Sequence, residues 1–181
     1  MKRVIILVIA LGLASATAFA GQLDRKDAQV ANDVIKTIDH YSRFSIFDDV
    51  SVQVSNGMVI LTGKVTMPFK AADIAKRAAK VDGVKGVDNK IAALPASLFD
   101  NQLRYRIARA IYRNPEFQGY AILANPPIHI VVDRGRVTLT GVVNSDVDRR
   151  LARALASFSG AFSVKSEIRT NEEARAERIG D

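Results

Sequence analysis

Apolar and polar residues alternate along two stretches in the first half of the chain, on either side of an Asn-Gly pair. Valines alternate with polar residues over 50–55, and the alternation resumes over 58–65 after Asn56-Gly57. Strict alternation is typical of a strand with one buried face. Asn-Gly favours a two-residue turn between antiparallel strands. The pattern therefore predicts a β-hairpin.

The same pattern occurs a second time, 78 positions further along the chain. Residues 128–143 contain alternating apolar positions, an Arg134-Gly135 turn and the Leu-Thr-Gly sequence that also occupies 61–63. Self-similarity at a fixed spacing indicates an internal duplication. We therefore expect two small homologous domains.

Helical patterns flank the first hairpin. One apolar face predicts a helix over about residues 25–43, with an acidic Asp24-x-x-Asp27 start; the face consists of Val30, Val34, Ile35, Ile38 and Tyr41. After the hairpin, Thr66 is expected to cap and Pro68 to open a helix that stops at Gly83. A last strand is expected over 87–91.

The second repeat is predicted to contain the same elements. Its first helix carries Leu103, Ile107, Ala110 and Ile111 and ends at Asn114-Pro115. Ser145 is expected to cap the second helix, and Phe162, Val164 and Ile168 to form the closing strand. Residues 116–127 exceed the matching gap of the first repeat, which predicts an exposed loop. The charged residues 171–181 predict a frayed helix or a disordered tail.

The amino-terminal end has the features of a secretory signal peptide. A basic Met1-Lys2-Arg3 start precedes the apolar run of 4–14, and Ala18-Phe19-Ala20 is a small-x-small cleavage site before Gly21. The apolar run is shorter than the roughly 20 residues needed to span a bilayer. We expect export, cleavage after Ala20 and a periplasmic location.

Composition narrows the possible chemistry. The chain of 181 residues contains no cysteine, so thiol chemistry and cysteine metal sites are excluded. Residues 21–181 carry 24 basic and 19 acidic side chains, a net charge of +5. The basic residues differ between the halves, with eight Lys and three Arg over 21–97 but one Lys and twelve Arg over 98–181. Because guanidinium pairs bidentately with phosphate, we expect any specific phosphate contact in the second half.

These patterns predict an α+β fold of two tandem α-β-β-α-β domains, each a short three-stranded sheet packed against two helices. The expected boundaries are a signal peptide at 1–20, a first domain at 21–94, a linker at 95–98, a second domain at 99–170 and a polar tail at 171–181. The linker is so short that the domains must touch or nearly touch.

The repeated pattern resembles the BON domain family. The first copy matches at Gly57, Leu61, Gly63, Val65, Gly83, Val84, Val87, Asn89 and Ile91. The second copy keeps Gly135, Leu139, Gly141, Val143, Gly160 and Val164, with Ala161 and Ser166 in place of the valine and asparagine. The resemblance implies an envelope location, no catalysis, and a role in binding phospholipid membranes or assisting envelope proteins.

The matching residues have an architectural interpretation. Gly57, Gly63, Gly135 and Gly141 are expected to supply positive φ angles or a close backbone approach. No nucleophile, base and orienting group stand at a spacing typical of catalysis, and no phosphate-binding loop occurs. His40 and His129 are isolated, and Asp48-Asp49 is interpreted as a solvated turn rather than a cation site. We expect no enzymatic activity and no cofactor or metal.

Basic helix faces are the candidate functional surfaces. Arg106, Arg109 and Arg113 share the face opposite the core of the first helix in repeat two, with Tyr105 and Tyr112 on its flank. Arg149, Arg150 and Arg153 form a second cluster, while Lys70, Lys76, Arg77 and Lys80 decorate the equivalent helix of repeat one. Cations with interfacial aromatic residues are typical of a membrane-contacting helix. An ordinary solvated face is the alternative.

Three functions are compatible with the sequence. The first is an envelope protein that associates with anionic phospholipid and supports envelope integrity under stress. The second is a periplasmic chaperone or adaptor that binds client proteins. The third, nucleic-acid binding, is allowed by the charge but opposed by the export signal. Salt separates the first two, because phosphate contacts are screened and apolar contacts are not.

Overall fold

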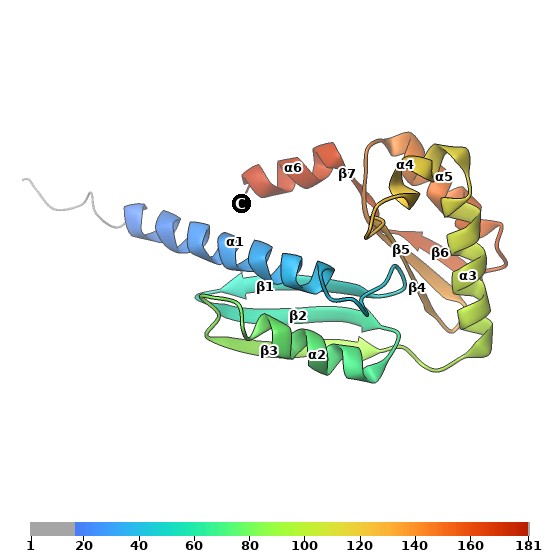
Figure 1. Ribbon diagram of the computed structural model, residues 1–181. Helices are drawn as coiled ribbons and strands as arrows, with labels where there is room; N and C mark the ends of the chain where they lie inside the picture. The colour runs from blue at the N-terminus through green and yellow to red at the C-terminus, as the bar shows by residue number, and fades with distance from the viewer. Residues whose placement is uncertain (1–16, 181) are drawn as a thin grey trace, which may run out of the picture.

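The computed structural model describes residues 17–180 (Figure 1). The predicted signal peptide lies outside this range except for residues 17–20, and its expected cleavage point falls inside α1 (Thr17–Asp39). Among residues 26–39, the part of α1 whose side chains the structure describes, the first buried one is Val30. Cleavage after Ala20 would therefore shorten α1 without removing part of the described core.

The first repeat has the predicted order of elements. After α1 come β1 (Asp49–Ser55), β2 (Met58–Val65), α2 (Pro68–Ala78) and β3 (Gly86–Ala93). The sheet order is β1-β2-β3, with β1 antiparallel and β3 parallel to β2. Because β3 runs parallel to β2, a crossover is required, and α2 provides it. The helices α1 and α2 pack on the sheet (Figure 1).

The second repeat has the same architecture with additions. It contains α3 (Leu98–Tyr112), β4 (Ile128–Asp133), β5 (Arg136–Val143), α5 (Asp146–Ser157) and β6 (Ser163–Ser166), with sheet order β4-β5-β6. The additions are η1 (Pro115–Phe117), α4 (Gln118–Ala121), β7 (Arg169–Thr170) and α6 (Asn171–Gly180). The α+β fold of two tandem domains is thus as predicted.

Each repeat has its own core, built from the predicted apolar positions. Val34, Leu61 and Ile74 are completely buried in the first core, and Ile107, Leu139 and Ala152 in the second. The spacing of four residues between buried positions of α1 and of α3 places them on one helical face. Burial of these side chains supplies most of the stabilisation, since the chain has no disulfide.

Backbone conformation and close backbone contacts explain the glycines of the two hairpins. Gly57 and Gly135 have φ angles of 79° and 74° in the turns. Gly63 and Gly141 have φ angles of 125° and 114°, and a Cβ atom there would lie 2.2 Å from the Asp49 carbonyl oxygen and 1.8 Å from that of Pro127. A side chain at either of these latter positions would overlap with backbone.

A carboxylate from the first helix of each repeat fastens the hairpin turn. Asp27 accepts hydrogen bonds from the amides of Asn56 and Gly57, and Asp100 accepts them from Arg134 and Gly135. The expected role of Asp27 in starting a helix is wrong, because α1 begins at Thr17 and Asp27 lies in its interior. The carboxylates instead satisfy turn amides that the strand ladder leaves free.

Several loop predictions need correction. The segment predicted as an exposed loop, 116–127, contains η1 and α4, and Phe117 is completely buried in the second core. Thr66 does not cap α2, whose N-cap residue is Met67, with no side-chain hydrogen bond. Ser145 does cap α5, accepting a hydrogen bond from the Asp148 amide at 3.1 Å.

The end of the second repeat departs from a single closing strand. Residues 163–170 form two short strands, β6 and β7, which both pair with β5. Phe162 precedes them and is 79% exposed. The tail forms α6, in which Ala174 is buried and Glu173 pairs with Arg149. Of the two expectations for the tail, the helix is the one observed.

The repeats contact each other through the segment before β1 and the strand β4. Ile46 and Phe47 pack against the second core, and the amide of Ile130 donates a hydrogen bond to the Ile46 carbonyl at 2.6 Å. The boundary drawn at 94–95 therefore follows the duplication, whereas the packing crosses it.

Candidate functional site

The arginine face of α3 lies in solvent. Arg106, Arg109 and Arg113 are exposed, and no carboxylate among the described residues pairs with any of them. Their spacing places them opposite the buried residues Leu103 and Ile107. Three unpaired guanidinium groups on one helix face can bind phosphate groups bidentately.

The two tyrosines predicted to flank this face have different environments. Tyr105 is 61% exposed, and its ring contacts that of Phe47 with centroids 5.1 Å apart. Tyr112 is half-buried, and its hydroxyl donates to the carbonyl and accepts from the amide of Ile128. Burial raises the pKa of Tyr112. Tyr112 is thus held to β4 by its hydroxyl, whereas most of Tyr105 faces solvent.

The second predicted cluster, on α5, is largely neutralised. Arg149 pairs with Asp146 and Glu173, and Arg150 pairs with Asp146. The hydrogen bonds that Arg149 donates to Glu173 and Asp146 raise the pKa of Arg149. Arg153 is exposed and has no carboxylate partner among the described residues. Arg153 is therefore the member of this cluster whose charge is unpaired among the described residues.

Large apolar side chains are exposed close to the start of α3, a feature that the sequence analysis missed. Leu98 is 82% exposed and Phe158, at the end of α5, is 90% exposed. Phe99 stacks on Phe162 with ring centroids 5.9 Å apart. We call these four residues the apolar rim. The signal that could have found it is the presence of Phe99 and Phe158 at positions that the core pattern does not use.

The basic helix of the first repeat is not a uniform surface. Lys70 is buried, and its Nζ lies 2.6 Å from the Asp48 carboxylate, which is completely buried. The interpretation of Asp48 as part of a solvated turn is therefore wrong. Arg77 lies over the Tyr41 ring, 4.6 Å from its centroid, while Lys76 and Lys80 remain exposed.

Asp48 is the centre of a buried polar network. Its carboxylate accepts hydrogen bonds from Ser45, Thr66 and Lys70. Burial alone would raise the pKa of Asp48, but the hydrogen bonds from Lys70, Thr66 and Ser45 outweigh it and hold the pKa below its usual value. The network joins the start of β1 to α2, so its role is structural.

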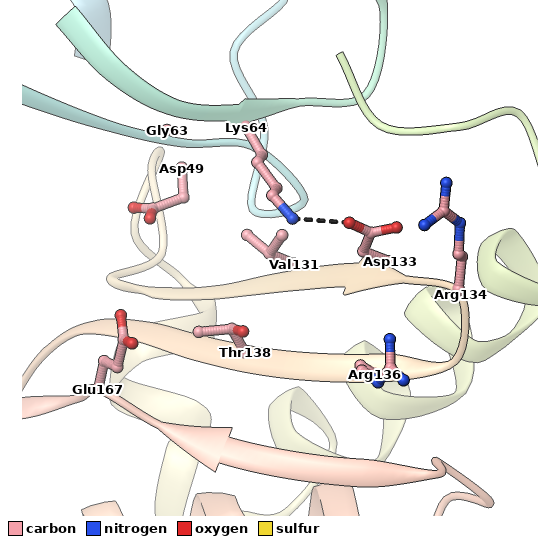
Figure 2. A pocket seen from close by; sticks show the side chains of 9 residues that line it. All are labelled: Asp49, Gly63, Lys64, Val131, Asp133, Arg134, Arg136, Thr138 and Glu167. Carbon is pink, nitrogen blue, oxygen red and sulfur yellow. Dashed lines mark hydrogen bonds and ion pairs between the residues drawn. The ribbon is translucent and has the colours of Figure 1, made fainter. Parts of the chain in front are cut away.

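A cavity of about 430 Å³ lies between the repeats, at the end of β2 and on the open face of the second sheet (Figure 2). An ion pair between Lys64 and Asp133, 2.6 Å long, crosses it. The hydrogen bond from Lys64 lowers the pKa of Asp133. Arg134, Arg136 and Glu167 line the remaining wall. Cations and carboxylates alternate here, so the cavity favours neither sign of ligand.

Neither histidine lies in a catalytic arrangement. Nδ1 of His129 contacts the Asp48 carbonyl oxygen, and its ring contacts that of Phe44. Nδ1 of His40 contacts the carbonyl oxygen of Lys36 one turn earlier in the helix. Within residues 17–180, no group of three or more His, Asp or Glu side chains could hold a metal ion. In the same range no helix has both the length and the apolar character needed to cross a bilayer.

Two stretches of the chain, residues 26–95 and 100–172, match the family model of the BON domain. The chain belongs to the BON domain family. The two matches correspond to the two repeats, and together they span most of the sequence. BON domains are a non-catalytic family of binding domains associated with membranes and phospholipids.

Other comparisons add little about this BON protein. No curated protein matches the chain. Among solved structures it is similar to CdsD, a structural protein of the type III secretion system of Chlamydia trachomatis, at 16% identity and a TM-score of 0.26, covering 81% of this chain and 98% of that one. A structure of the C-terminal domain of CdsD gives 17% identity and a TM-score of 0.27, covering 76% and 97% of the two chains.

Proposed function

We propose that this BON protein is a non-enzymatic, exported envelope protein of the periplasm that binds anionic phospholipid surfaces through α3 and supports envelope integrity under stress. The observation that carries the proposal is the unpaired arginine face of α3, formed by Arg106, Arg109 and Arg113. The association of BON domains with phospholipid supports it.

The apolar rim also supports membrane contact. Phe158 and Phe162 are largely exposed, and Phe99 stacks on Phe162, so the rim presents aromatic rings to solvent. The rim and the arginine face adjoin, because Arg106 lies near Gly160, between Phe158 and Phe162 in the chain. Exposed aromatic residues beside cations are typical of proteins that lie at a membrane interface.

The expected strength is that of reversible binding. Each arginine near an anionic leaflet contributes about 1 kcal/mol, a contribution that fades within a Debye length of about 8 Å at physiological salt. The membrane affinity that three arginines and a small aromatic surface provide is far below that of a transmembrane anchor. We expect dissociation to be rapid and binding to fall as salt increases.

Vesicle flotation tests the proposal directly. The protein beginning at Gly21 should float with vesicles that contain phosphatidylglycerol and not with vesicles of phosphatidylcholine alone. Replacing Arg106, Arg109 and Arg113 by Glu should abolish flotation, because the like charges then repel the surface.

A matched control distinguishes this site from net charge. Reversing three exposed lysines of the first repeat, Lys76, Lys80 and Lys85, makes the same change in total charge and should leave most of the flotation. Lys70 is unsuitable for this control because it is buried against Asp48. If the arginine variant floats as well as the lysine variant, α3 is an ordinary solvated face and the adaptor function becomes the leading hypothesis.

A further inference from the structure

The two hairpins present equivalent strand edges. In each, two residues form the turn, so the residues that flank it, Ser55 with Met58 and Asp133 with Arg136, form a hydrogen-bonded pair. Bonded and non-bonded pairs then alternate along an antiparallel ladder. The outward-facing backbone groups are consequently those of Val50, Val52 and Val54 in β1, and of Ile128, Ile130 and Val132 in β4.

All three outward positions of β4 are covered. The hydroxyl of Tyr112 binds the backbone of Ile128, the carbonyl of Ile46 accepts from the Ile130 amide, and the guanidinium of Arg104 donates to the Val132 carbonyl at 2.6 Å. Ile128, Ile130 and Val132 are completely buried. These bonds also agree with the outward direction inferred from the turn.

The edge of β1 has none of this cover. Aligning the buried residues of α1 and α3 puts Ala31 at the position of Arg104 and Asp39 at that of Tyr112. Alanine has no polar group to replace the Arg104 guanidinium. The Asp39 carboxylate cannot donate to a carbonyl, and the side-chain hydrogen bond that it accepts comes from Asn125 and not from β1. Within residues 17–180, β2 is the strand that pairs with β1, and no other element bonds the outward backbone groups.

A groove of about 710 Å³ runs along this edge. Five consecutive residues of β1, from Asp49 to Gln53, line it. Since neighbouring side chains of a strand point to opposite faces, only the edge of a strand can present consecutive residues to one groove. The opposite wall comes from the second repeat, with Pro127, His129 and Val142 among its residues.

The groove has a recognisable charge. Three carboxylates line it, those of Asp39, Asp49 and Glu167, together with Arg169, and Glu167 also pairs with Lys165, 2.5 Å away. Asp39 and Asp49 each accept one hydrogen bond from a neutral side chain of the second repeat, from Asn125 and Thr140 respectively. The groove is therefore negative within a chain whose formal net charge is positive, which favours a basic occupant.

We propose that the open edge of β1 binds an extended, basic segment of a partner protein by strand addition. The main-chain groups of Val50 and Val52, which line the groove, supply the ladder bonds, and the carboxylates select lysine or arginine on the face turned toward the second repeat. This site is separate from the arginine face of α3, so it stands or falls independently of membrane binding.

A labelled decapeptide of alternating valine and lysine is the probe. Its fluorescence anisotropy should rise on titration with the protein that begins at Gly21. Two control peptides should bind at least about tenfold more weakly. One has glutamate in place of lysine, and the other has proline in place of every second valine, which removes ladder donors.

The protein variants Val52→Pro and Val54→Pro make a matched pair. Both replace an outward amide of β1 and spare the bonds to β2, but only Val52 lines the groove. Val52→Pro should weaken binding about tenfold, whereas Val54→Pro should change it little. Circular dichroism of both variants establishes that they are folded.

A substitution that does not alter the backbone tests the groove without disrupting the fold. Glu167 is exposed and its ion pair with Lys165 lies at the surface, so Glu167→Gln should change stability little and weaken the lysine peptide at low salt. Equal binding of the lysine and glutamate peptides, equal effects of the two proline variants, or no binding of the lysine peptide at low salt would each overturn the proposal.

Discussion

The two repeats hold the same backbone amide with different chemistry. In the first repeat the buried Asp48 carboxylate accepts from the Thr66 amide and pairs with Lys70 of α2. In the second, the Tyr120 hydroxyl accepts from the equivalent Asn144 amide and donates to Asp148, which occupies the position of Lys70. A buried ion pair in the first repeat and a hydroxyl-carboxylate hydrogen bond in the second thus occupy equivalent positions in the fold.

The difference teaches which parts of the fold are free to change. Apolar positions, turn glycines and the turn-binding carboxylates Asp27 and Asp100 are retained, because each meets a demand of the backbone. The polar interior needs only mutual satisfaction, since a buried donor requires an acceptor of any kind. The two repeats therefore satisfy the same backbone amide with different sets of polar groups.

The largest expected effect is that of breaking the ion pair. Asp48→Asn leaves the Lys70 ammonium buried without an opposite charge and should cost the first repeat about 3–5 kcal/mol. Asp148→Asn keeps an oxygen for the Tyr120 hydroxyl and should cost about 1 kcal/mol. Urea unfolding of both variants measures the two losses. Similar losses would mean that the Asp48 network carries no more free energy than its neutral counterpart.

Low pH should weaken the ion pair between Asp48 and Lys70. The folded-state pKa of Asp48 lies below its unfolded value of about 3.9, so its stabilisation is complete above that pH and is lost as the pH falls through the lowered pKa. The unfolding free energy of the wild type should therefore fall more steeply below about pH 4 than that of Asp48→Asn. Parallel curves for the two proteins would contradict this assignment.

The turn-binding carboxylates should differ by their burial. Asp100 is 1% exposed and Asp27 is half-buried, although each accepts two amide hydrogen bonds. Asp100→Ala should cost about 3 kcal/mol and Asp27→Ala about 1 kcal/mol, because water can replace the lost acceptor only at the more exposed turn. Thermal unfolding of each variant decides whether burial sets the ranking.

The smallest effect is expected at the contact between the repeats. Lys64 and Asp133 have side chains 45% and 29% exposed, so Lys64→Gln should cost less than about 1 kcal/mol. Calorimetry should show one unfolding transition before and after the substitution, because Ile46 and Phe47 also join the repeats. A split into two transitions would show that the ion pair is the main coupling between them.

Local sequence patterns were sufficient to predict the helices and strands of the fold. The hairpins and the buried stripes of α1 and α3 follow from periods of two and of 3.6 residues, which neighbouring residues determine. The same reasoning placed Arg106, Arg109 and Arg113 on an exposed face. These predictions needed no knowledge of how the elements pack.

The polar interior could not be predicted in the same way. Asp48 meets Thr66 and Lys70 only after the chain has turned through the hairpin, 18 and 22 residues later. Tyr112 bonds to Ile128 across a segment whose short helices no periodicity indicates. One sequence signal was available for Asp100, since it stands on the core face of α3 at the place that Asp27 has on α1.

The cover that Ile46 gives to β4 has a consequence for biosynthesis. Ribosomes make the chain from its amino-terminal end, so the first repeat is complete before the second hairpin exists. If the chain folds in the order in which it emerges, at the ribosome or after export, Ile46 and Phe47 are available before β4. The earlier domain thus serves as a template that protects the newest strand from pairing with other chains. In a chain with the two repeats in the opposite order, β4 would emerge before the segment that covers it.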